Sequence, residues 1–214
     1  MNTLTKFALG VMGQLRPRPP TGDAAACIDL PAPEKRGGMP LMDALARRCS
    51  TRAFSSAEIA LPMLSDLLWS AFGVNRADGG RTAPSALNAQ EIEVFVALPG
   101  GAYRFDAVSH QLQLVAGADL RRVTGYQDFV DEAPLDLVYV ADHKRLRMVP
   151  AAQREAYAYA AAGAIAQNVY LYAAGNALAT VIRAWIDRDA IAGALGLSPD
   201  QQVLLSQTVG LPKG

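Results

Sequence analysis

Apolar residues recur at helical spacing in several parts of the chain. In the run 61–72, Leu64, Leu67 and Phe72 share one side of a helix, and Gly73 ends the run. A spacing of three to four residues between apolar positions predicts a helix that packs against a core. The predicted helices cover 40–46, 61–72, 151–174 and 189–195, with a short one over 118–124.

Strand-like runs lie between these helices. Residues 111–115 alternate between apolar and polar, and a Pro99–Gly101 turn joins the mostly apolar run 91–98 to 103–105. This region predicts an antiparallel meander. Residues 135–141 are almost continuously apolar, as a central strand would be. Further strands are predicted over 178–182 and 202–209. Strands and helices are partly segregated along the chain, which predicts an α+β fold.

One long segment has the length of a membrane span. No charged residue occurs from Ala156 to Ile182, and such a length could cross a bilayer. However, alanine dominates the segment, Gln167 and Asn168 interrupt it, and Gly175 stops the helix. We therefore expect a buried helix followed by a buried strand, with no membrane span. Its small residues allow close approach, which suits the centre of a core or of a subunit interface.

The first 39 residues differ from the rest in composition. Residues 1–39 are rich in Pro and Gly, so we expect an extended or mobile arm before a domain over 40–214. The apolar run 7–12 is similar to a secretory signal but is too short, and no adequate apolar segment precedes Cys27 in its lipoprotein-like setting. A cytoplasmic location is expected, with export through an atypical signal as the alternative.

Composition and charge narrow the function further. A chain of 214 residues with 51% apolar and 19% charged residues forms one domain or two small ones. The net charge of +0 gives no electrostatic reason to expect nucleic acid or an anionic membrane as a partner. Two cysteines and two histidines make no metal-binding spacing. Hydrolase, dinucleotide and phosphate-loop motifs are absent from the sequence.

The most distinctive chemistry lies just after the run 40–46. Arg47, Arg48 and Arg52 gather with Ser50 and Thr51 where a helix gives way to extended chain. Guanidinium forks bind phosphate with two hydrogen bonds, and nearby hydroxyls can complete the cradle. The alternative is a solvated helix end, where basic residues suit the helix dipole.

Two blocks of sequence point to a known family. Arg48–Phe54 resembles the Arg-x-Ser-x-Arg/Lys-x-Phe opening of FMN-dependent nitroreductases, and Thr82–Gln90 resembles their Ala-Pro-Ser-x-x-Asn-x-Gln segment. The blocks stand in the family's order, and the resemblance covers about residue 40 to the end. It leans to the branch that holds the thiazoline/oxazoline oxidases. It implies a nitroreductase-like, mixed and largely antiparallel sheet surrounded by helices, built as an intertwined homodimer with shared FMN sites.

The resemblance also implies which residues contact FMN. The first block would hold the phosphate, the ribityl chain and the O2 edge of the ring, with Cys49 contributing its backbone. The second block would lie against the ring, usually from the partner subunit, although Glu91 here follows the Gln where relatives have Pro. For Arg183, a phosphate contact and a salt bridge both stay open. The implied FMN contacts are Arg48, Cys49, Ser50, Arg52, Pro84, Ser85, Ala86, Asn88, Gln90, Gln127, Ala179, Thr180 and Lys213.

The function implied by the resemblance is that of an FMN-dependent oxidoreductase. NADH or NADPH would reduce the flavin and leave, and a small nitroaromatic or quinone-like acceptor would then take its place. The cofactor would carry the chemistry, so no side chain is expected to act as a catalytic residue. The alternatives are an FMN-dependent dehydrogenase or oxidase of the azoline-oxidase kind, and a non-catalytic flavin-binding protein.

Overall fold

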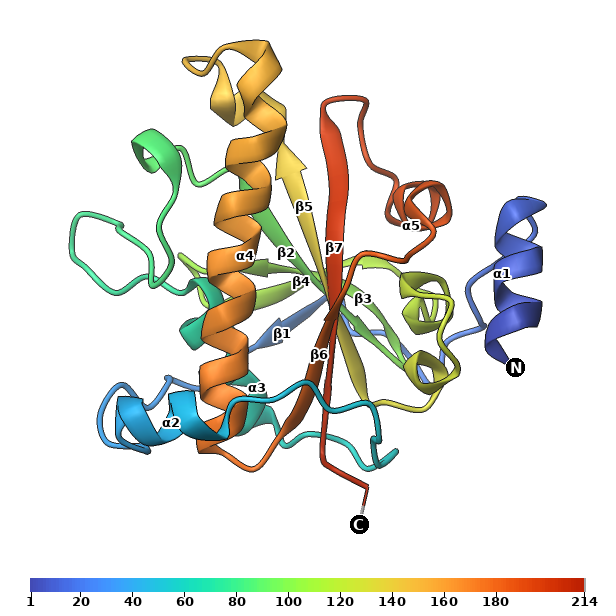
Figure 1. Ribbon diagram of the computed structural model, residues 1–214, viewed down its shortest axis with the longest axis horizontal. Helices are drawn as coiled ribbons and strands as arrows, with labels where there is room; N and C mark the ends of the chain where they lie inside the picture. Colours follow the sequence, from blue (N-terminus) through green and yellow to red (C-terminus); the bar gives the residue numbers. More distant parts are fainter. Residues whose placement is uncertain (214) are drawn as a thin grey trace.

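One seven-stranded sheet with helices on both faces forms the frame of the protein (Figure 1). The computed structural model describes residues 1–213. The strand order is β1-β4-β3-β2-β5-β7-β6, and every strand pair in this part of the chain is antiparallel. The α+β fold class predicted from the sequence is confirmed. The strands are β1 (Cys27–Asp29), β2 (Ile92–Leu98), β3 (Gly101–Asp106), β4 (Gln111–Ala116), β5 (Leu135–Asp142), β6 (Ala179–Arg183) and β7 (Gln201–Gly210).

The helices predicted over 40–46, 61–72, 151–174 and 189–195 form close to those positions, whereas the one predicted over 118–124 is only a 3-10 helix over 121–124. Helix α3 has a proline in its first turn, where no backbone N–H is needed, and the N–H of Gly73 closes it by donating to the carbonyl of Trp69. Helix α5 starts at Asp187, whose side chain accepts a hydrogen bond from the N–H of Ala190, and ends at Gly196 in the left-handed conformation. The α-helices are α1 (Thr3–Val11), α2 (Leu41–Arg47), α3 (Leu61–Phe72), α4 (Ala151–Gly175) and α5 (Arg188–Leu195), and the 3-10 helices are η1 (Ala86–Asn88), η2 (Arg121–Thr124), η3 (Asp128–Asp131) and η4 (His143–Leu146).

The central strand β5 shows why its sequence lacks alternation. Leu137 and Tyr139 point to the face that α3 and α4 cover, whereas Val138 and Val140 point to the face that α5 covers. Successive side chains of a strand lie on opposite faces, so a strand covered on both sides is apolar at nearly every position.

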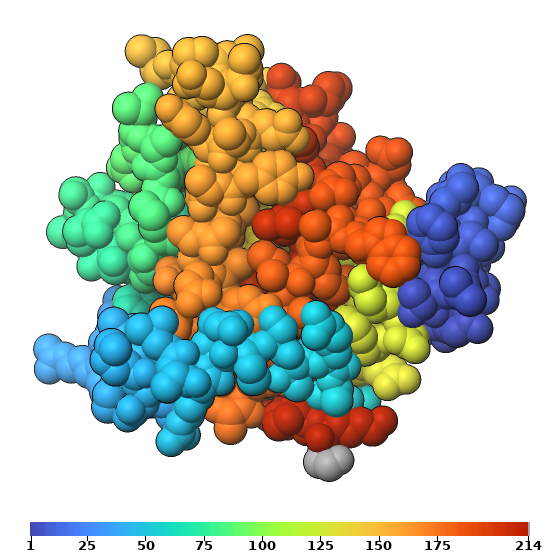
Figure 2. All heavy atoms as spheres, viewed as in Figure 1, coloured from blue at the N-terminus to red at the C-terminus, as the bar shows by residue number. Residues whose placement is uncertain are grey.

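Helix α4 crosses one face of the sheet (Figure 1) and is buried on one side only. Ala162, Ile165 and Val169 lie in the core, whereas Ala160 and Gly163 are exposed. Figure 2 shows the open side in the upper part of the helix, above the segment that follows α2 and crosses its lower part. Of the helices within residues 1–213, none is long and apolar enough to cross a membrane.

The N-terminal arm is not extended throughout, in contrast to the prediction for residues 1–39. It contains helix α1, capped by Asn2, and strand β1, which pairs with β4 at the edge of the sheet. The ammonium group of Lys6 is buried and forms an ion pair with Asp131. This pair explains why a helix forms in a segment with weak local signals. The proposed boundary between an arm and a domain at residue 40 stays a prediction.

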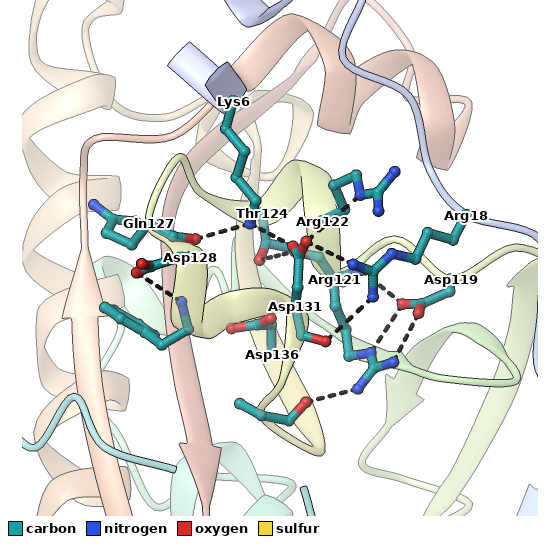
Figure 3. A network of polar contacts seen from close by, with 12 residues as sticks. Lys6, Arg18, Asp119, Arg121, Arg122, Thr124, Gln127, Asp128, Asp131 and Asp136 are labelled. Atoms are coloured by element: carbon teal, nitrogen blue, oxygen red, sulfur yellow. Dashed lines mark hydrogen bonds and ion pairs between the residues drawn. The ribbon is translucent and has the colours of Figure 1, made fainter. Parts of the chain in front are cut away.

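The N-terminal arm is anchored at Asp131, at the end of the 3-10 helix η3. Besides Lys6, Arg18 from the arm donates to it at 2.6 Å, and Arg122 lies 3.6 Å away (Figure 3). Phe7 packs on Tyr126 and Trp185, with ring centroids 5.4 and 5.5 Å apart. The arm is therefore fixed by both charge and aromatic packing.

Candidate functional site

Residues Arg47–Phe54 form the arginine-rich block, which lies between the end of α2 and the start of β6. The N–H of Thr51 donates to the carbonyl of Thr180 at 3.0 Å, which aligns the block with the first residues of the strand. Phe54 then enters the core and packs on Phe129, with ring centroids 5.5 Å apart. Burial of this phenylalanine fixes the end of the block, while its polar residues stay at the surface.

Tyr170 of α4 contacts both the arginine-rich block and β6. Its hydroxyl group accepts a hydrogen bond from the N–H of Ile182 at 3.0 Å and shares a second hydrogen bond with the Ser50 hydroxyl, 2.8 Å away. Its ring lies 5.2 Å from the guanidinium of Arg48, within the range of a cation–π contact. One tyrosine thus joins α4, β6 and the arginine-rich block.

The cations of the block are available to a ligand. Across residues 1–213, neither Arg47, Arg48 nor Arg52 forms an ion pair, and Arg52 is exposed. The Cys49 thiol is exposed as well, 3.5 Å from the Thr51 hydroxyl. Unpaired guanidinium groups beside hydroxyls are the donor set that an FMN phosphate needs, so the residues present fit this part of the cofactor.

The C-terminal segment joins the same region. The N–H of Lys213 donates to the carbonyl of Ala53 at 3.2 Å, and the N–H of Ser55 donates to the carbonyl of Leu211 at 2.9 Å. Ala179 and Thr180 lie beneath the block at the start of β6, and both are buried. The Thr180 hydroxyl donates to the carbonyl of Thr208, so its proton is used in a hydrogen bond between β6 and β7.

The second block forms a tight loop that is held by its own side chains. The Ser85 hydroxyl accepts a hydrogen bond from the N–H of Gln90 at 2.8 Å and donates to the fully buried carboxylate of Glu91. Leu87, Asn88 and Gln90 have left-handed backbone conformations, with φ of 54°, 51° and 50°. These hydrogen bonds offset the strain that such conformations cost non-glycine residues.

The polar groups of this loop are largely occupied. The Gln90 amide accepts from Arg81 Nε at 2.9 Å and donates to Gly79 and to Asn88 Oδ1 at 3.0 and 3.1 Å. Asn88 is exposed, as is Pro84. Contacts of Ser85, Asn88 and Gln90 with FMN stay predictions, and the Ser85 hydroxyl proton is already committed to Glu91.

The two blocks lie at different positions along α4. Pro84, Ser85 and Ala86 line a cavity of about 330 Å³ with Tyr157 and Ala160, whereas the first block contacts Tyr170. At 1.5 Å per residue, the contact points on the helix are about 15 to 20 Å apart. One chain therefore presents the two predicted halves of the flavin site at separate places.

Arg183 forms a salt bridge, which answers the question that the sequence left open. Its Nη2 lies 2.6 Å from Asp136 and 2.8 Å from the Thr208 hydroxyl, and its Nη1 donates to the carbonyl of Thr124 at 2.7 Å. Burial raises the pKa of Asp136, and Arg183 opposes this effect. Nη1 of Arg183 also donates to the side-chain oxygen of Gln127 at 3.4 Å, and contact of Gln127 with FMN stays a prediction.

A serine and a histidine meet elsewhere in the fold. Ser65 of α3 lies 2.6 Å from His110 Nε2, but it is buried and donates its proton to the carbonyl of Pro31. Burial lowers the pKa of His110. Because the serine proton goes to a carbonyl, the pair is structural and makes no nucleophile.

Tyr170 and Glu91 are the residues that sequence reasoning missed. Each is a polar group within an apolar run, and such groups need partners when buried. The sequence shows Tyr170 within the alanine-rich run 151–174 and Glu91 at the start of the apolar run 91–98. The sequence does not reveal that their hydrogen-bond partners are Ser50 and Ser85.

Comparisons with known proteins identify the family of the chain. The model of the nitroreductase family matches residues 45–211. A crystal structure of a provisionally named nitroreductase from Ralstonia eutropha JMP134 is 50% identical and has a TM-score of 0.90, with 94% of this chain and 96% of that one covered. A provisionally named nitroreductase from Methanocaldococcus jannaschii is 30% identical over 139 residues, 60% of this chain and 70% of that protein.

The fold extends to more distant structures. The NADPH:FMN oxidoreductase of Vibrio harveyi, solved with NAD⁺, has a TM-score of 0.59 at 18% identity, covering 81% of this chain and 69% of that one. The fold and family define an oxidoreductase of the flavin type. The chain belongs to the nitroreductase family.

Proposed function

We propose that the protein is an FMN-dependent oxidoreductase, reduced by NADH or NADPH, that passes hydride to a small nitroaromatic or quinone-like acceptor in the cytoplasm. The observation that carries the proposal is the arginine-rich block. Its guanidinium groups form no ion pair within residues 1–213; Arg48 lies over the Tyr170 ring of α4, and the backbone N–H of Thr51 donates to Thr180 of β6. The Vibrio harveyi structure with the same fold bears the name of an FMN-linked enzyme.

The residues of the block would divide the work of binding. Arg48, steadied on the Tyr170 ring, and the exposed Arg52 would bind the phosphate, and Ser50 would add a hydroxyl oriented by the same tyrosine. Bound FMN would supply the acceptor and donor of hydride. The loop from Pro84 to Gln90 would lie against the ring and exclude water from it.

We further propose that a second copy of the chain completes each site. The two blocks lie apart along α4, and the exposed side of this helix carries Ala160 and Gly163, which permit close helix contact. Helix α2 adds Leu41 and Met42, which are 62% and 74% exposed. Covering these apolar residues in a homodimer would bring the loop of one chain to the arginine-rich block of the other.

The test is FMN titration of matched arginine variants. Arg52→Ala should weaken FMN binding about 10- to 100-fold, since a hydrogen bond to a charged group is worth ~1.5–3 kcal/mol. Arg47→Ala, one residue before the motif, should change it less than about 3-fold. Equal effects of the two substitutions would show that only general positive charge matters and would contradict the assignment.

Reduction by nicotinamide then tests the reaction. We expect NADH or NADPH to bleach the bound flavin under argon and a nitroaromatic compound to restore its colour. Bleaching by dithionite alone would contradict the nicotinamide-driven reaction. In that case, turnover of an azoline peptide would indicate a dehydrogenase of the azoline-oxidase kind, and its absence a flavin-binding protein without catalysis.

A further inference from the structure

A separate polar cavity of about 260 Å³ lies between β2, β3 and the chain around Arg81. Its wall has an apolar part, which includes the buried Phe72, Ile92 and Phe105. Its polar part includes three arginines and two acids, so the formal charge of the wall is +1. The polar residues of the wall are Arg81, Gln90, Glu93, Arg104, Asp106 and Arg145.

The two acids of the cavity already have partners. Glu93 lies 3.3 Å from Arg104 and accepts from Gln201 at 2.5 Å. Asp106 accepts from the N–H groups of Val108 and Ser109 at 2.9 and 3.2 Å. Burial alone would raise the pKa of Asp106, but these hydrogen bonds outweigh it and lower the pKa. Both carboxylates are thus accounted for inside the protein.

Arg81 is the cation of this cavity that lacks a counterion. Its Nε donates to Gln90 at 2.9 Å and its guanidinium lies 5.4 Å from the Phe72 ring, but Nη1 is buried without a hydrogen-bond partner in residues 1–213. No acid there lies within ion-pair distance of it. A guanidinium without a counterion is costly to bury, and a carboxylate bound at the part of Arg81 that lines the cavity would neutralise its charge.

We propose that this cavity binds a small organic carboxylate, with its anionic group on Arg81 and its apolar body against Phe72, Ile92 and Phe105. A purely inorganic anion would leave the apolar wall unused. A neutral apolar molecule would leave Arg81 without an acceptor. The site is distinct from the arginine-rich block, but it shares Gln90 with the loop proposed to lie against the FMN ring. Binding of the carboxylate requires no bound FMN.

The experiment is calorimetric titration of the full chain with 3-phenylpropionate. The neutral amide of the same acid and inorganic phosphate serve as comparison ligands. We expect saturable binding of the carboxylate, at least 10-fold weaker binding of the amide, and weaker binding of phosphate. Phosphate that binds as tightly as the carboxylate would overturn the organic acid as the ligand.

Variants locate the binding. Arg81→Gln should weaken binding at least 10-fold, whereas Arg76→Gln, in the same loop with its side chain 59% exposed, should leave it unchanged. Val108 lines the cavity and is 79% exposed, so Val108→Trp should obstruct the cavity without disturbing the core. This variant tests the site even if Arg81→Gln fails to fold.

Arg52→Ala separates this proposal from the proposed function. Carboxylate binding should survive this substitution, since the arginine-rich block lies elsewhere. Binding that is lost in Arg52→Ala, or that persists in Val108→Trp, would overturn the assignment to this cavity. Absence of saturable binding to the full chain would overturn it as well, whatever the outcome of the FMN titrations.

Discussion

Replacing Tyr170 by phenylalanine should loosen the arginine-rich block while leaving its charges in place. The substitution removes only the hydroxyl group, so the ring stays under Arg48. The N–H of Ile182 then loses its acceptor, and the Ser50 hydroxyl loses its hydrogen-bond partner. Ser50 is exposed and can bond to water instead, so the N–H of Ile182 dominates the cost.

The size of the effect follows from these two contacts. A buried donor left without a partner costs ~1–3 kcal/mol, and the N–H of Ile182 is partly buried; an exposed hydrogen bond is worth less than that. We expect a loss of about 2 kcal/mol, which corresponds to a decrease of ~4–8 °C in Tm for a chain of this size. FMN binding should weaken about 5- to 10-fold, because Arg48 and Ser50 would be less well oriented.

Tyr172→Phe is the matched control, in the same helix and with the same chemical change. Its hydroxyl donates to the carbonyl of Met63 at 3.4 Å, a long hydrogen bond, and among residues 1–213 it forms no hydrogen bond with the block. Burial raises the pKa of Tyr172 to about 12. Thermal unfolding followed by circular dichroism and FMN titration followed by flavin fluorescence measure both effects. Equal behaviour of the two variants would refute the reasoning.

Three further predictions concern the interior. Arg183→Met should cost ~3–5 kcal/mol of unfolding free energy in denaturant titrations, since it leaves Asp136 buried and unpaired; adding Asp136→Leu should recover much of the loss, and no recovery would argue against the unpaired charge as its cause. Gly125→Ala should cost ~1–3 kcal/mol, because the new Cβ would overlap Nη1 of Arg183; an unchanged Tm would contradict this. Burial lowers the pKa of His110, so the folded state prefers the neutral ring. Stability should therefore decrease as the pH falls below about 6.5, the unfolded value, towards the lower folded value. His110→Asn should flatten this slope in pH-dependent unfolding, and an identical slope would contradict its origin in His110.

The positions of the main helices and strands could be predicted because capping residues and apolar runs within each segment determine them. The run 61–72 has a proline near its start and a glycine at its end, and α3 occupies those residues. The continuous apolar run 135–141 predicted a central strand, and β5 lies between β2 and β7. These elements depend on capping and on burial on both faces, which a single segment displays.

Long-range contacts explain what the sequence did not reveal. Helix α1 attaches through Lys6 to Asp131, 125 residues further along the chain, so its anchor has no local signal. The loop after Pro84 depends on Glu91, which stands where the family resemblance leads one to expect proline. The separation of the two blocks along α4 likewise emerges only from the packed structure, and it is the reason for proposing a shared site.

The most direct test of the central claim is the visible absorption spectrum of the purified full-length protein, before and after added FMN. We expect a flavin spectrum, with FMN released on denaturation in an amount equimolar to the chain, and a weaker one for Arg52→Ala. A colourless protein that stays colourless after FMN is added and excess is removed would contradict the proposed role of the arginine-rich block.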